Sequence, residues 1–94
     1  MSDFYRFFET AEASLFIKLN EQKKHNITIN GKKTSVKLEP QTWQILNKIA
    51  EKQGCTPSEL CSFINERKGN KSSLASAIRV FLISYLYIQT KKEE

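Results

Sequence analysis

The residues that break secondary structure stand where one element must end or another begin. The 94 residues include three glycines and two prolines. Gly31, Gly54 and Gly69 close segments, whereas Pro40 and Pro57 open them, because proline fits the first turn of a helix and glycine the position after its end. These positions divide the chain into short elements of one small domain.

Two short β-prone runs, Ile27–Ile29 and Lys33–Leu38, flank the turn dipeptide Asn30-Gly31. A strand places alternate side chains on opposite faces, so the second run has one apolar face and one polar face. The apolar face carries Thr34, Val36 and Leu38, and the polar face carries Lys33, Ser35 and Lys37.

Two helices follow the strands. The first is expected from Pro40 to Gly54, with a buried stripe at helical spacing. The second must begin at Thr56-Pro57-Ser58-Glu59, where threonine is the cap and the glutamate three positions later completes a capping box, and it should end near Lys68. The stripe of the first helix is Trp43, Leu46, Ile49 and Ala50, and the inward residues of the second are Leu60, Phe63 and Ile64.

The two ends of the chain are less patterned. A third helix is expected from Ser72 or Ser73 to about Gln89, and its wide apolar surface indicates packing between subunits. Residues 90–94 read as a tail. Residues 1–24 are expected to form a partly helical N-terminal extension. Its aromatic side chains are expected to cover a core; binding of a protein partner is the minority interpretation.

Positive charge is concentrated in two islands, within a net charge of +5. Residues 23–37 hold five lysines and no acid. Such islands suit phosphate contact, although a solvated lysine face explains them equally well. The second island is interpreted as solvated surface or an intersubunit salt bridge rather than a DNA contact; it comprises Arg67, Lys68, Lys71 and Arg79.

Catalytic and metal chemistry have no support in the sequence. His25 is the single histidine and has no nucleophile or carboxylate at a recognisable spacing. Cys55 and Cys61 lack the spacing of a zinc site or a disulfide framework. No apolar run approaches membrane-spanning length, and the first residues do not have the order of a signal peptide. We therefore expect a cytoplasmic protein that is not an enzyme and has no cofactor or metal.

The order of strand, helix, short turn and capped helix resembles the ribbon-helix-helix superfamily of MetJ-like and Arc-like repressors. Residues 31–40 look like the family's strand and entry to its first helix, and residues 54–59 resemble its turn between helices. Residues 76–81 resemble the third-helix segment of one bacterial and phage branch of the superfamily. The resemblance covers about residues 25–88, and we assign residues 25–89 to this domain.

The resemblance implies a mainly α fold: an intertwined homodimer whose two-stranded antiparallel ribbon forms between subunits, with an extra C-terminal helix. The ribbon would enter the major groove of double-stranded DNA. Expected base contacts are Lys33, Ser35 and Lys37, and expected phosphate contacts are Lys32, Thr56 and Ser58. The dimer core would comprise Val36, Leu38, Trp43, Leu46, Ile49, Leu60, Phe63 and Ile64.

Two functions follow from this resemblance. The first is a sequence-specific transcription regulator of the repressor type. The alternative is an antitoxin or protein-interaction adaptor that binds a protein partner through the N-terminal segment or the third helix. Assembly beyond a dimer on DNA is left open.

Overall fold

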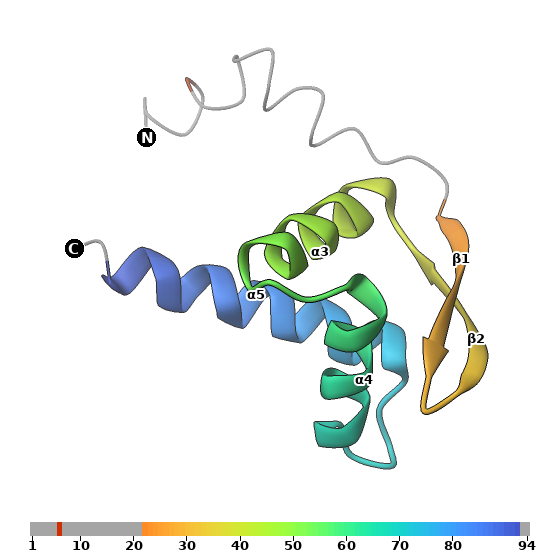
Figure 1. Cartoon of the computed structure of the whole chain (residues 1–94). Helices are drawn as coiled ribbons and strands as arrows, with labels where there is room; N and C mark the ends of the chain where they lie inside the picture. The colour runs from red at the N-terminus through yellow and green to blue at the C-terminus, as the bar shows by residue number, and fades with distance from the viewer. Residues whose placement is uncertain (1–5, 7–21, 93–94) are drawn as a thin grey trace.

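A computed structural model describes residue 6 and residues 22–92. The order of elements is β1 (Lys23–Ile29), β2 (Lys32–Leu38), α3 (Pro40–Lys52), α4 (Pro57–Arg67) and α5 (Leu74–Lys92) (Figure 1). The mainly helical fold with a short β-ribbon and a third helix is confirmed. The helix and the extended segment expected before Glu21 lie outside the described residues, apart from Arg6.

The ribbon is a hairpin within one chain. β1 pairs antiparallel with β2, and Ile29 lies opposite Lys32 beside the turn. Asn30 and Gly31 have φ angles of 51° and 80°, the positive values that a two-residue hairpin turn of type I′ requires. The ribbon was expected to form between two subunits; here the Asn-Gly turn folds the preceding run back onto β2. β1 begins at Lys23, so it includes two residues that we had assigned to the N-terminal extension.

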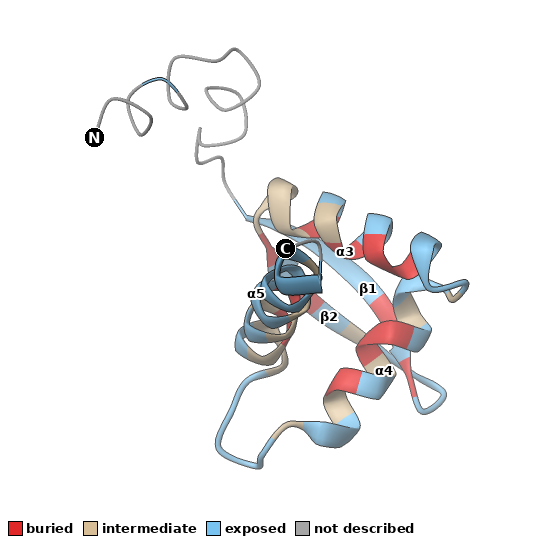
Figure 2. Cartoon of the chain, turned by 90° about the vertical axis from the view of Figure 1, so that its left-hand side faces the viewer, coloured by how far each residue is buried: buried red, intermediate tan, exposed pale blue. Residues whose placement is uncertain are grey.

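One face of the ribbon closes the hydrophobic core. Ile27, Ile29, Val36 and Leu38 are buried, and they alternate with exposed neighbours in the expected period of two. The buried residues of the strands and helices face the enclosed side of the fold (Figure 2). The Trp43 indole N–H also donates a 2.8 Å hydrogen bond to the carbonyl of Lys23, which ties α3 to the start of β1.

The ends of α3 and α4 follow the sequence signals. After α3, Gly54 takes a φ of 73°, which is the left-handed conformation that glycine favours after a helix. The Glu59 N–H donates to Thr56 Oγ1 at 3.0 Å, and the Thr56 N–H donates to Glu59 Oε1 at 2.9 Å. The capping box is therefore confirmed, as is the buried stripe Trp43, Leu46, Ile49 and Ala50.

The third helix, α5, is longer than expected and keeps the expected wide apolar surface. It ends at Lys92, three residues beyond Gln89, and Lys91 and Lys92 suit the negative end of the helix dipole. Ile78 and Leu82 are buried against the rest of the chain. An apolar stripe remains exposed on the outer side, and we call Val80, Ile83, Leu86 and Tyr87 the α5 stripe. None of the helices in the described part is long and apolar enough to cross a membrane.

A cluster of polar side chains joins the ribbon, α3 and α5. Arg79 donates from Nε and Nη2 to the two carboxylate oxygens of Glu39, both at 3.1 Å. Gln22 and Thr42 also donate to this carboxylate. The Arg79 guanidinium, followed by the Gln22 amide, lowers the pKa of Glu39 from 4.5 to about 2. Glu39 therefore fastens the junction between β2 and α3 to α5 instead of capping α3 with its side chain.

This junction predicts acid-sensitive stability. Because the pKa of Glu39 is lower in the folded chain, its contribution is complete above about pH 4.5 and is lost as the pH falls toward about 2. Arg79→Met should lower the free energy of unfolding by on the order of 1 kcal/mol at pH 7, a modest value because both side chains keep solvent contact.

Urea unfolding at pH 7 and pH 3 measures this contribution. The wild-type chain should lose more stability between the two values than Arg79→Met does. Equal losses in the two proteins would show that the pair does not couple folding to protonation of Glu39.

Candidate nucleic-acid interface

The outer face of the ribbon is polar and basic. The register places Lys24 opposite Lys37, Asn26 opposite Ser35 and Thr28 opposite Lys33. Directly opposite residues share a face, and all six of these side chains are exposed. The face holds three lysines and no acidic residue, so its charge suits an anionic ligand.

The opposite face of the ribbon packs on the core. Each outward side chain of β2 alternates with an inward one, and Val36 and Leu38 are 5% and 0% exposed. The structure therefore places Lys33, Ser35 and Lys37 together in one exposed row, as expected for base contacts. No residue of the facing row Lys24, Asn26 and Thr28 was among the expected base contacts, although the two-residue turn Asn30-Gly31 contains the signal that fixes its register.

The three expected phosphate contacts do not form one group with that row. Lys32 is exposed, but its register opposite Ile29 puts it on the other face, beside the turn. Thr56 Oγ1 is engaged in the cap of α4. Ser58 Oγ accepts a hydrogen bond from the Thr28 N–H at 3.3 Å, so it fastens the edge of β1. Contact between these residues and phosphate stays a proposal.

The two edges of the hairpin differ. In an antiparallel pair, every second residue points its N–H and C=O groups away from the partner strand. Thr28 is such a residue, because its N–H bonds Ser58 and its C=O accepts from Ser62 Oγ at 3.4 Å. By alternation, the opposite strand presents the N–H and C=O groups of Lys33, Ser35 and Lys37 at its own outer edge. Within residues 22–92, no backbone hydrogen bond reaches these groups, so in this part of the chain the outer edge of β2 is open to a further strand. Residues 73–75 at the start of α5 line a pocket with Ser35 and Lys37.

The expected dimer-core residues are buried within one chain, with one exception. Val36, Leu38, Trp43, Leu46, Ile49, Leu60 and Ile64 all belong to the core of the single chain. Phe63 is 44% exposed, although its helical spacing indicated an inward position. Its ring lies at the margin of α4, where Phe81 of α5 meets it edge-on at 6.4 Å between ring centres.

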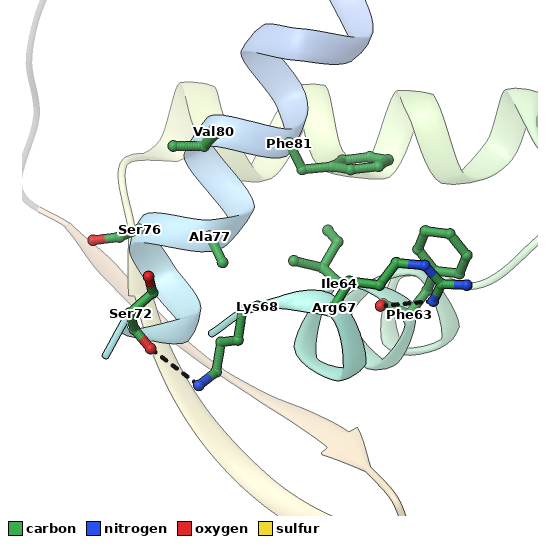
Figure 3. A pocket seen from close by; sticks show the side chains of 9 residues that line it. All are labelled: Phe63, Ile64, Arg67, Lys68, Ser72, Ser76, Ala77, Val80 and Phe81. Atoms are coloured by element: carbon green, nitrogen blue, oxygen red, sulfur yellow. Dashed lines mark hydrogen bonds between the residues drawn. The ribbon is translucent and has the colours of Figure 1, made fainter. Parts of the chain in front are cut away.

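The second basic island is largely engaged in contacts within the chain. Arg79 pairs with Glu39, where we expected solvated surface or an intersubunit salt bridge. The Arg67 guanidinium lies 3.5 Å from the ring centre of Phe63, and Lys68 donates to the Ser72 carbonyl at 3.0 Å. Both residues line a groove of about 310 Å³ between α4 and α5. Figure 3 shows their side chains among those that line it.

The described part of the chain has no metal site, and its one buried cysteine is not a nucleophile. Its histidine, cysteine and acidic side chains form no group of three or more that could hold a metal ion. Burial raises the pKa of the Cys61 thiol to about 11, which keeps it protonated at neutral pH. A reactive thiolate at Cys61 is therefore excluded.

The two-stranded antiparallel ribbon followed by three helices agrees with the fold of ribbon-helix-helix DNA-binding proteins. The chain belongs to the ribbon-helix-helix domain family, whose sequence profile matches residues 22–86. Domains of this family are DNA-binding regulatory domains and not enzymes, and the family implies DNA binding and dimerisation.

Comparison of structures supports the fold. An uncharacterized protein from Bordetella pertussis Tohama I is similar, with a TM-score of 0.67 and 24% sequence identity. The alignment covers 92% of this chain and 75% of the Bordetella chain. No curated protein matches the sequence.

Proposed function

We propose that the protein is a sequence-specific transcription regulator of the repressor type, which acts in the cytoplasm as a homodimer on double-stranded DNA. One observation carries the proposal: the row Lys33, Ser35 and Lys37 lies on the exposed face of the ribbon, opposite the face that packs on the core. The lysines can donate to O6 and N7 of guanine, and the serine hydroxyl can donate or accept. Lys32, Thr56 and Ser58 would add phosphate contacts near the turn and the start of α4.

The open edge of β2 supports a dimer. An unpaired strand edge is a template for a second strand, whereas the edge of β1 is bonded to α4 at Thr28. Antiparallel pairing of two β2 strands about Ser35 would satisfy the outward groups of Lys33, Ser35 and Lys37 in both chains. The two polar rows would then lie side by side at the centre of a four-stranded sheet.

Selection of bound duplexes from a random DNA library tests this function. We expect enrichment of an inverted repeat, because a two-fold dimer reads two equivalent half-sites. Sedimentation of the free protein at micromolar concentration should give a mass near twice 10.9 kDa. A stable, folded monomer that enriches no sequence would contradict the proposal.

A protein-binding function, as an antitoxin or adaptor, is the second candidate. The exposed α5 stripe favours it, because Val80 and Ile83 are 64% and 69% exposed on a helix that packs on the core through Ile78 and Leu82. Ile83→Lys distinguishes the two functions. Under the adaptor function this variant loses a partner that co-purifies with the wild type at fixed stoichiometry, while DNA selection is unchanged.

A further inference from the structure

The outward row of β1 lies beside the expected base contacts but has no role in the proposed function. Lys24 and Asn26 face the same side as Lys37 and Ser35, directly across the hairpin. Both are exposed, and no hydrogen bond of either side chain occurs within residues 22–92. β1 precedes the strand that leads into α3, so this row is an addition to the single ribbon strand that the resemblance implied.

The edges of the hairpin fix where β1 must lie in a dimer. Ser58 and Ser62 of α4 occupy the outer edge of β1 at Thr28, so a second chain can extend the sheet at β2. The strand order of the dimer is then β1, β2 and, from the second copy, β2 and β1. Both β1 strands become the outer strands.

The width of this sheet determines what its outer strands meet. Neighbouring strands lie about 4.8 Å apart, so the two outer strands of four are about 14 Å apart. The major groove is about 12 Å wide and admits two strands. The central β2 strands therefore enter the groove, while both β1 strands lie over the sugar-phosphate backbones that border it.

We propose that Lys24 and Asn26 form a phosphate-binding row that clamps the DNA backbone on each side of the groove. This inference rests on the proposed function. Lys24 neutralises one phosphate, and the Asn26 amide donates a hydrogen bond to another. Thr28, at the other end of the row, lines the same groove as Glu59 and Glu66 of α4. Because these carboxylates repel phosphate, the clamp is centred on Lys24 and Asn26.

The salt dependence of DNA binding tests the clamp. Full-length wild type, Lys24→Ala and Asn26→Ala are titrated with two 30-base-pair duplexes, one selected from the random library and one of scrambled sequence. Each lost phosphate contact reduces the slope of log affinity against log salt by about 0.9, so Lys24→Ala should reduce it by about 1.8 in a dimer. Asn26→Ala should weaken binding to both duplexes by the same factor.

Lys23→Ala is the matched control, because it removes the same charge from the adjacent position on the other face of β1. Its slope should stay near that of the wild type. Equal slopes for Lys23→Ala and Lys24→Ala would overturn the clamp, since charge alone would then explain the effect. Loss of binding by Asn26→Ala on the selected duplex alone would also overturn it, because Asn26 would then read a base inside the groove.

Failure of the clamp is distinguishable from failure of the proposed function. If Lys24→Ala binds both duplexes like the wild type while changes at Lys33, Ser35 and Lys37 abolish selection, only the clamp is wrong. If wild type binds neither duplex, both are wrong. Lys24→Gln, which keeps a long polar side chain, and thermal unfolding by circular dichroism separate loss of the charge from loss of the fold.

Discussion

The triple variant Lys33→Ala, Ser35→Ala and Lys37→Ala should fold and dimerise like the wild type but lose sequence-specific DNA binding. All three side chains are exposed, and the buried Val36 and Leu38 between and beside them are unchanged. Each good base contact contributes about 1–3 kcal/mol of discrimination. Loss of the symmetric set should reduce binding to the non-specific level, a decrease of about a thousandfold or more on the selected duplex.

A matched triple variant on α3 controls for loss of charge. Gln44→Ala, Lys48→Ala and Lys52→Ala also removes two lysines and one uncharged polar side chain from an exposed face. This control should keep selective binding. If the ribbon variant still selects the wild-type sequence with normal affinity, the ribbon is not the reader, and Lys68 and Lys71 become the next residues to test.

The sequence predicted the elements whose signals are local. The period of two in β2, the stripe of α3 and the capping box at Thr56 each lie within a few adjacent residues, and the structure confirms all three. Packing of distant segments was harder to predict. Glu39 and Arg79 are 40 positions apart, and no local pattern links a residue before α3 to one inside α5. The same limit explains Phe63, whose exposure depends on where α5 crosses α4.

The ribbon shows how a resemblance can outweigh a local signal. Asn30-Gly31 between two β-prone runs predicts a hairpin, and the structure contains that hairpin. The family resemblance placed the partner strand in a second subunit, so the polar residues of β1 received no role in base reading. The hairpin register alone would have placed Asn26 beside Ser35 and Lys24 beside Lys37. The candidate interface is therefore twice as wide as the row that we predicted.

A charge introduced on the inner face of the ribbon should lower the stability of the fold, whereas a charge introduced on the outer face should not. Val36 is 5% exposed and lies among the apolar side chains of the core. Val36→Glu would place a carboxylate among apolar side chains, and an uncompensated buried charge destabilises a protein by about 3–5 kcal/mol. Since small domains are stable by about 5–15 kcal/mol, this change should unfold a large part of the population or lower the urea midpoint steeply.

Lys37→Glu is the control, because it adds the same carboxylate one position later, where the side chain is exposed on the outer face and lies opposite Lys24. That variant should keep the wild-type urea midpoint and lose DNA binding, since its charge repels phosphate. The same charge at two adjacent positions of β2 would then have two different effects: on the inner face it would lower stability, and on the outer face it would abolish DNA binding. A normal midpoint for Val36→Glu would mean that the ribbon does not pack on the helices through this face, and the outward direction of Lys33, Ser35 and Lys37 would lose its structural basis.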